Sequence, residues 1–274
     1  YADGILVCPT SAGALVAVDL ATRSLLWGYR YSRSIASRQR IPFFAGQLGR
    51  YPGSPRLSRW TDANPIVVDG HVLFTPTESD TLYCLDLIDG RQRWTVSRED
   101  DLYVGCVHRG SVVLVGRQGV RALGLADGKP AWDGRILEFA DGGMPSGHGF
   151  YSGNEYLVPL STAEIAVIDL DRGRTVHVAR SRQGQVPGNL VSYQGMVLSQ
   201  SATGLGAFDQ LDVLRRRVTD RLAKSPDDAE ALAVAQARPG LLADHAIDAK
   251  SGVGALELLH RRLGARAEVA IDGQ

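Results

Sequence analysis

The sequence predicts an all-β fold, a partial β-propeller of four-stranded blades, followed by a C-terminal α-helical tail. A unit of roughly 40 residues recurs about five times, and this is the size of one propeller blade. Short apolar runs rich in β-branched residues, separated by Asp-Gly and related turns, indicate antiparallel strands. An Asp and a Trp within the unit also keep one spacing from copy to copy. With 274 residues, 44% hydrophobic and 22% charged, the chain has the composition of a globular protein.

Each unit begins with a hairpin glycine and an apolar triplet, continues through an alternating run that ends in Asp-Leu, and closes with a Trp. In the first copy these parts are Gly4, Ile5 to Val7, Leu15 to Leu20, and Trp27. The later copies begin at Gly70, Gly110, Gly153 and Gly195, and the fifth stops matching after Asp209. An insertion at about residues 30–64 separates the first two copies.

The signature residues of the repeat are Asp19, Trp27, Asp86, Trp94, Trp132 and Asp169. In four copies the closing position lies eight residues after the Asp position, although Gly124 replaces one Asp and His177 replaces one Trp. We expect the Asp to accept backbone N–H bonds in the next turn, and the Trp to open the outer strand and cover the neighbouring blade. The turn glycines Gly90, Gly128 and Gly173 should supply the positive φ of a tight hairpin. These residues are therefore interpreted as structural.

The segments Ala17–Thr22 and Cys84–Arg91, each followed by its Trp, carry a family resemblance. They resemble the Ala-x-Asp-x-x-Thr-Gly-Lys-x-x-Trp signature of the pyrroloquinoline-quinone-type, or quinoprotein-like, β-propeller repeat. The resemblance covers about residues 1–209. It implies membership of a family that divides into quinone-dependent dehydrogenases and non-catalytic propellers, the latter including an outer-membrane assembly lipoprotein and sensor domains attached to kinases. A WD-repeat propeller is less favoured, because Trp132-Asp133 is the single Trp-Asp pair.

The sequence favours the non-catalytic branch. The resemblance implies that a quinone enzyme would hold its cofactor with a stacking Trp, calcium, an Asp base and, for alcohol oxidation, an adjacent Cys-Cys disulfide. Cys8, Cys84 and Cys106 are far apart, so we expect buried free thiols. The expected inner strands hold almost no acidic residues, and the histidines show no metal-ligand spacing. We therefore expect no catalytic residue, cofactor or metal.

A candidate site lies at the ends of the expected innermost strands, which line the central funnel of a propeller. Asn64, Tyr103, Ser146 and Asn189 stand six or seven residues before successive hairpin glycines, and His148 lies beside Ser146. These residues are a candidate funnel rim that contacts a ligand or peptide. The alternative is that they are polar residues that cap strand ends, and this alternative is favoured.

The insertion is rich in arginine and aromatic residues. It holds Arg30, Arg33, Arg38, Arg40, Arg50, Arg56 and Arg59. This mixture could bind nucleic acid or another polyanion. A loop whose aromatic rings pack on the propeller while the arginines face water is the favoured alternative, and the 30 basic and 30 acidic residues of the chain cancel.

The hydrophobic period changes after Asp209, so we divide the chain into propeller blades at 1–209 and a helical tail at 210–274. Leu211, Leu214, Val218 and Leu222 share one helical face. Ser225 is expected to cap a second helix, with Pro226 at its first position. Residues 226–232 resemble the opening of a tetratricopeptide repeat, which Pro239-Gly240 then interrupts, and 240–274 are predicted as a poorly specified helical tail.

The expected function is a non-enzymatic binding or scaffolding propeller with protein partners. The first copy lacks its innermost strand and five blades are few for a closed ring, so we expect a fragment of a larger multidomain protein. The resemblance implies a periplasmic or otherwise extracytoplasmic location, and no apolar run is long enough for a membrane span. The alternatives are a quinone-dependent alcohol or sugar dehydrogenase and a ligand-sensing domain attached to a kinase.

Overall fold

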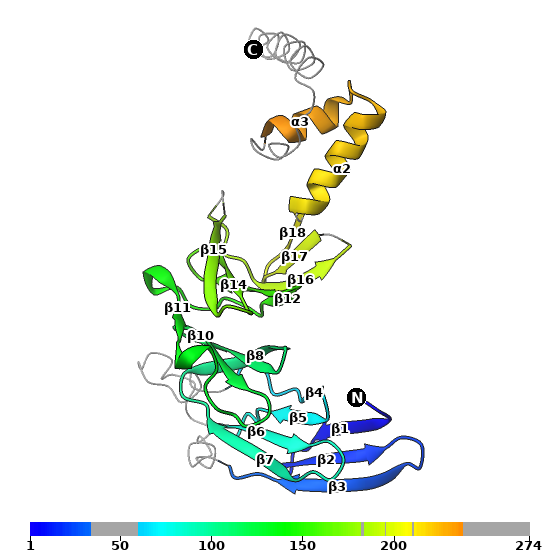
Figure 1. The fold of residues 1–274 in the computed structure, drawn as a ribbon, viewed down its shortest axis with the longest axis vertical. Helices are drawn as coiled ribbons and strands as arrows, with labels where there is room; N and C mark the ends of the chain where they lie inside the picture. The colour runs from blue at the N-terminus through cyan, green and yellow to red at the C-terminus, as the bar shows by residue number, and fades with distance from the viewer. Residues whose placement is uncertain (34–59, 182–183, 195, 210, 238–274) are drawn as a thin grey trace. The chain divides into compact units, whose positions relative to one another are not determined.

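A computed structural model describes residues 1–33, 60–181, 184–194, 196–209 and 211–237. The chain is mostly β, with two helices after the last strand of the described part (Figure 1). It divides into two compact units, one of residues 1–191 with 199–204 and one of residues 192–198 with 205–274. The partial β-propeller predicted from the sequence is confirmed.

Antiparallel strands form five sheets, which we call the first to fifth blades. The first blade contains β1 (Ile5–Pro9), β2 (Ala14–Asp19) and β3 (Ser24–Arg30). The second contains β4 (Ile66–Val68), β5 (His71–Phe74), β6 (Thr81–Asp86) and β7 (Gln92–Ser97). The third contains β8 (Asp101–His108), β9 (Ser111–Gly116), β10 (Gly119–Gly124) and β11 (Leu137–Glu138). The fourth contains β12 (Phe150–Ser152), β13 (Glu155–Leu160), β14 (Glu164–Asp169) and β15 (Arg174–Arg180). The fifth contains β16 (Asn189–Tyr193), β17 (Met196–Gln200) and β18 (Leu205–Asp209).

Strand alternation sets apolar residues on the faces of the sheets, and the first four blades bury the faces that lie between them. In the first blade Ile5 and Val7 point to the face that packs on the second blade, while Leu6 points away. One hydrophobic cluster joins the first and second blades, another joins the second and third, and another joins the third and fourth. The core therefore lies between blades rather than within one sheet, as in propellers.

A register shift recurs at one position of the repeat. It lies between Ala17 and Val18 in the first blade, between Cys84 and Leu85 in the second, and between Val167 and Ile168 in the fourth. The outer strand thereby places Trp27 opposite Ala17, and the other two blades follow the same pattern. A bulge of this kind adds local twist and aims one side chain.

Two expectations from the sequence were wrong in detail. Trp132 does not open an outer strand but begins a short 3₁₀ turn, Trp132–Gly134, and the outer strand follows as the short β11. Pro130 carries no N–H with which to extend the ladder, and Trp132 has a φ of 52°, which turns the chain away from extended geometry. All three cysteines are free thiols, but only Cys84 is buried.

The helices are α2 (Leu211–Lys224) and α3 (Ala229–Ala237). Leu214 and Val218 pack with Ala231, in agreement with the predicted apolar face of α2. The predicted N-cap was wrong, because Asp228 rather than Ser225 accepts the N–H of Ala231, at 2.9 Å. Pro226 and Asp227 form a turn, and α3 begins only at Ala229.

Neither described helix has the length and hydropathy to cross a bilayer. The predicted tail at 240–274 and the arginines of the insertion from Arg38 to Arg59 lie outside the described residues. The predicted division at 209/210 stays a prediction.

Candidate functional site

Each repeat tryptophan joins its blade to the following blade. The indole Nε1 of Trp27 donates to Leu87 O at 2.9 Å, that of Trp94 to Leu125 O at 2.8 Å, and that of Trp132 to Leu170 O at 3.2 Å. Each ring also lies against the turn glycine of that next blade. A Cβ on Gly90 would stand 2.5 Å from the Trp27 ring. We call this pairing the tryptophan contact.

The repeat carboxylates accept backbone hydrogen bonds from the turns that follow them. Asp19 Oδ1 accepts the N–H groups of Ala21 and Thr22, at 2.7 and 3.1 Å. Asp86 and Asp169 likewise accept the backbone N–H groups of the residues two and three positions after them. The N–H donors at this turn lower the pKa of Asp19 and Asp169.

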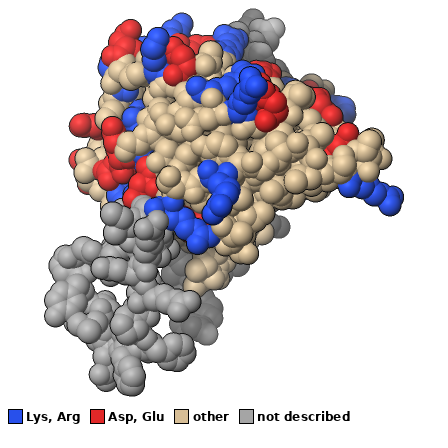
Figure 2. Space-filling model, turned by 90° about the horizontal axis from the view of Figure 1, so that it is seen from below, with Lys and Arg blue, Asp and Glu red and all other residues tan. Residues whose placement is uncertain are grey.

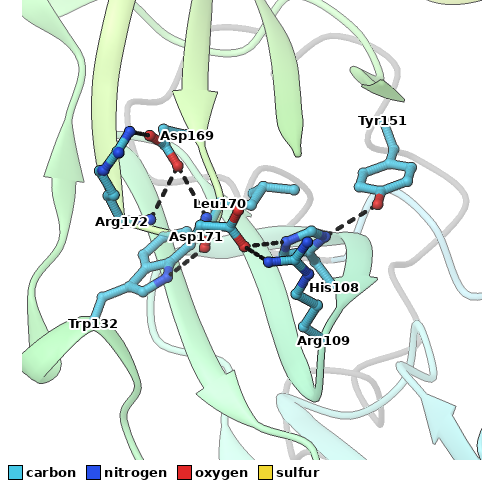
Figure 3. Close-up of polar contacts among 8 residues, drawn as sticks. All are labelled: His108, Arg109, Trp132, Tyr151, Asp169, Leu170, Asp171 and Arg172. Carbon is cyan, nitrogen blue, oxygen red and sulfur yellow. Dashed lines mark hydrogen bonds and ion pairs between the residues drawn. The ribbon is translucent and has the colours of Figure 1, made fainter. Parts of the chain in front are cut away.

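A polar cluster that the sequence analysis missed joins the third and fourth blades (Figure 3). His108 ends β8, and its Nε2 lies 2.8 Å from Asp171 Oδ1 while its Nδ1 lies 3.1 Å from the hydroxyl of Tyr151. Arg109 donates to the same Asp171 oxygen at 2.9 Å. These partners, first the His108 hydrogen bond and then the Arg109 charge, lower the pKa of Asp171.

This cluster is local to one blade junction. His108 is buried, whereas Tyr151 and Arg109 are exposed. The polar atoms of these side chains contact one another and Asp171. Little in the sequence indicates this cluster. His108 lies before a hairpin in the third copy and Asp171 lies two residues after Asp169 in the fourth, so no shared repeat position links them. The arrangement fits a bond between blades better than a catalytic relay.

Four of the five predicted rim residues come together. Tyr103 on β8 packs its ring 4.2 Å from that of His148, donates its hydroxyl to Gly147 O at 3.2 Å and accepts Gly149 N–H at 3.2 Å. Burial raises the Tyr103 pKa to about 12, so the phenol keeps its proton. We call Tyr103, Ser146, His148 and Asn189 the rim cluster.

The rim cluster spans three consecutive blades. The His148 N–H donates to Asn189 Oδ1 at 2.8 Å, and Ser146 Oγ donates to Pro187 O at 2.6 Å. Gly147 permits this approach, since a Cβ there would stand 2.5 Å from Asn189 N. The fifth residue, Asn64, is exposed, and its N–H donates to Asp62 at 2.9 Å. Among the described residues, the contacts of Asn64 do not join it to the cluster.

The described residues do not fit a quinone site. Cys8, Cys84 and Cys106 lie on three different strands, and desolvation raises the pKa of the buried Cys84 and of the partly buried Cys106 to about 12. The indoles of the repeat are used between blades, and Trp60 is buried. Within the described part, no group of three His, Cys, Asp or Glu side chains is placed to hold a metal. Among the described residues we therefore find no counterpart of the stacking indole, the disulfide or the calcium ligands of such a site.

Comparison with known proteins identifies the family. Residues 11–236 match the family described as Outer membrane protein assembly factor BamB. The chain belongs to this family. It is a member of the quinoprotein-type β-propeller repeat proteins, as its repeat signature predicted.

Solved structures share the fold at low identity. The crystal structure of BamB from Moraxella catarrhalis aligns with a TM-score of 0.51 and 19% identity, over 76% of this chain and 55% of that chain. A europium-containing methanol dehydrogenase aligns with a TM-score of 0.54 and 12% identity, over 76% of this chain and 47% of that chain. The chain thus spans about half the length of the structures that it matches. No curated protein matches it.

Proposed function

We propose that this chain is a non-enzymatic propeller domain that binds a protein partner through the rim cluster. The observation that carries the proposal is the convergence of Tyr103, His148 and Asn189 from three consecutive blades. Propellers commonly use the inner ends of their strands in this way, since these ends line the funnel.

The chemistry of the rim cluster suits an extended peptide. Asn189 is exposed, and the bond that its Oδ1 accepts from a backbone N–H does not use its amide N–H₂ group, which can donate to a ligand. His148 is half-buried and presents an imidazole ring supported by the ring of Tyr103. Amide and imidazole groups can donate to and accept from a peptide backbone without requiring a charged ligand.

The relatives support a binding role and an extracytoplasmic location. The matching family is named for outer-membrane protein assembly, and one similar structure is a BamB. The similar methanol dehydrogenase shares the fold, but the described residues do not fit a quinone. We also propose that the pair α2 and α3, whose start resembles a tetratricopeptide repeat, is a second interaction element and that the chain acts within a larger protein. The arginine-rich insertion is a less favoured site for a polyanion.

A peptide array tests the rim. Purified chain is incubated with immobilised 15-residue peptides of alternating apolar and polar residues, and bound chain is measured. Replacing His148 and Asn189 together with Ala should abolish the binding to peptides that the unchanged chain retains. His177→Ala, which removes an exposed histidine from β15, is the matched control. Equal binding by the rim variant, or no peptide bound by the unchanged chain, would reject the proposal.

A further inference from the structure

The backbone of His148 is fixed on both sides, which leaves its imidazole ring to contact a ligand. The His148 N–H donates to Asn189 Oδ1, and the His148 carbonyl accepts the N–H of Leu190, both at 2.8 Å. This close approach requires the glycines on either side, since a Cβ on Gly147 would stand 2.5 Å from Asn189 N and one on Gly149 would collide with a backbone oxygen. In the described part of the chain, no hydrogen bond uses the ring nitrogens of His148.

The imidazole ring is supported on one side by a buried aromatic ring. Tyr103 is 2% exposed, and the centroid of its ring lies 4.2 Å from that of His148. The two hydrogen bonds of the Tyr103 hydroxyl, with Gly147 and Gly149, fix the phenol in this position. A protonated imidazole above a phenol ring forms a cation–π pair. The stacked position therefore suits both the neutral and the charged form of His148.

The titratable groups packed around the imidazole are neutral where a histidine changes its charge, between pH 5 and 8. These groups are Tyr103 and Cys106 on β8 and Tyr156 on β13. Desolvation raises the pKa of Tyr103 and Cys106 to about 12, and it raises the pKa of Tyr156 as well. The carboxylate of Asp101, also on β8, is buried and paired with Arg121 at 2.6 Å. The imidazole is therefore the group of the rim cluster that gains a charge in mild acid.

The chain as a whole has no excess charge with which to attract an acidic ligand. It contains 30 basic and 30 acidic residues. Figure 2 shows side chains of both signs distributed over one face of the molecule. A preference for one sign of charge at the rim cluster must therefore come from the groups at the cluster itself.

We propose that the rim cluster binds a peptide that carries a carboxylate, which accepts hydrogen bonds from the imidazole of His148 and the amide of Asn189. The four residues of the cluster supply these donors and hold no acidic side chain that would repel the carboxylate. Binding strengthens when His148 is protonated, because the hydrogen bond then joins two charged groups. This inference rests on the proposed function and adds the chemical class of the partner.

Fluorescence anisotropy with three forms of one labelled peptide tests the proposal. The peptide is the one that the unchanged chain retains best on the array. Its polar positions carry Glu in the first form and Gln in the other two, and only the third form has a free C-terminus instead of an amide. Glu side chains stay ionised at pH 5.5. At this pH the Glu form should bind at least about threefold more tightly than the amidated Gln form, and the advantage should shrink at pH 8. An advantage of the third form alone would identify the terminal carboxylate as the group that is bound.

Replacing the histidine assigns the pH dependence to one side chain. His148→Gln keeps a hydrogen-bonding side chain but cannot gain a charge, so it should lose the advantage of the carboxylate forms at pH 5.5 and still bind the amidated Gln form. His177→Gln, at an exposed histidine of β15, is the matched control and should behave as the unchanged chain does. Thermal unfolding at both pH values checks that each protein is folded.

Two results would overturn this inference. One is equal binding of the three forms by the unchanged chain at pH 5.5, a comparison that needs no variant. The other is a carboxylate advantage at pH 5.5 that folded His148→Gln retains. In both cases binding of the neutral form through the rim cluster would leave the proposed function standing, whereas a chain that binds none of the three forms would contradict both.

Discussion

The turn glycines carry two constraints at once. Gly90, Gly128 and Gly173 have φ between 57° and 69°, where other residues are strained. Each also lies under the indole of the preceding blade. The sequence predicted the first constraint from the turn, but it gave no sign of the second because the ring comes from another copy of the repeat.

Gly90→Ala should therefore cost more than the backbone strain alone. We expect a loss of about 2–4 kcal/mol in the free energy of unfolding, from left-handed strain and overpacking against Trp27. Gly70→Ala is the matched control, since Gly70 has a φ of 70° and open space around its Cβ position. It should lose about 1 kcal/mol. Urea unfolding of both variants measures the difference, and equal losses would show that the ring contact adds nothing.

The roles of individual residues could be predicted where the same residue type recurs at one position of several repeats. The eight-residue spacing identified Asp19, Trp27 and their equivalents because one physical role recurs in each copy. His108 and Asp171 form a contact that occurs between two particular blades, so no periodicity marks it. The rim residues shared a repeat position, and four of them meet in space, while Asn64 does not join them in the described part.

At the scale of elements, the junction of the third and fourth blades should be sensitive to acid. The pKa of Asp171 in the folded chain is lowered from its ordinary value of 3.8. A carboxyl group whose pKa is lowered by folding stabilises the folded chain at pH values above its unfolded pKa. This stability is lost as the pH falls through the pKa of the folded chain. The pKa of Asp86, Asp169 and Glu164 is lowered too, so these carboxylates should also contribute less stability in acid.

Asp171→Asn tests how much of the loss of stability in acid comes from the junction of the third and fourth blades. The variant should unfold at lower urea than the unchanged chain at pH 7, and its midpoint should fall less between pH 7 and pH 3. The reason is that the variant lacks one carboxylate whose ionised form the fold stabilises. Asp133→Asn, at a carboxylate 90% exposed, is the control and should follow the unchanged chain. Parallel pH profiles for all three proteins would contradict the account.

The second helix start offers a separate test. Asp228 accepts Ala231 N–H and pairs with Arg221, so Asp228→Ala should reduce the helix content or stability of the α2–α3 pair by about 1 kcal/mol. Ser225→Ala should have little effect, because Ser225 lies before the turn rather than at the cap. Circular dichroism at 222 nm during thermal unfolding compares them. A larger loss for Ser225→Ala would restore the cap expected from the sequence.

Elements were predicted best where alternation and turns agreed. The blades follow from short apolar runs, and α2 follows from the apolar spacing of Leu214 and Val218. The outer strand of the third blade was misplaced, because Trp132 carries the repeat signature but adopts a left-handed turn. Likewise, Ser-Pro-Asp-Asp offers several possible caps, and local sequence does not decide which side chain reaches the helix N–H groups.

At the scale of the whole molecule, one fold serves both assembly factors and dehydrogenases, so the fold does not decide the function. Residues decide it. The described cysteines are separate, the repeat indoles lie between blades, and the rim cluster is polar and holds no acidic side chain.

Titration of the purified chain with pyrroloquinoline quinone and calcium distinguishes a binding domain from a quinone-dependent enzyme. Quinone absorbance reports binding, and dye-linked oxidation of methanol, ethanol and glucose reports turnover. We predict no stoichiometric binding and no oxidation above that of quinone and calcium without protein, because the residues that such a site needs are missing from the described blades. Stoichiometric binding accompanied by turnover would contradict the account and identify the chain as part of a dehydrogenase.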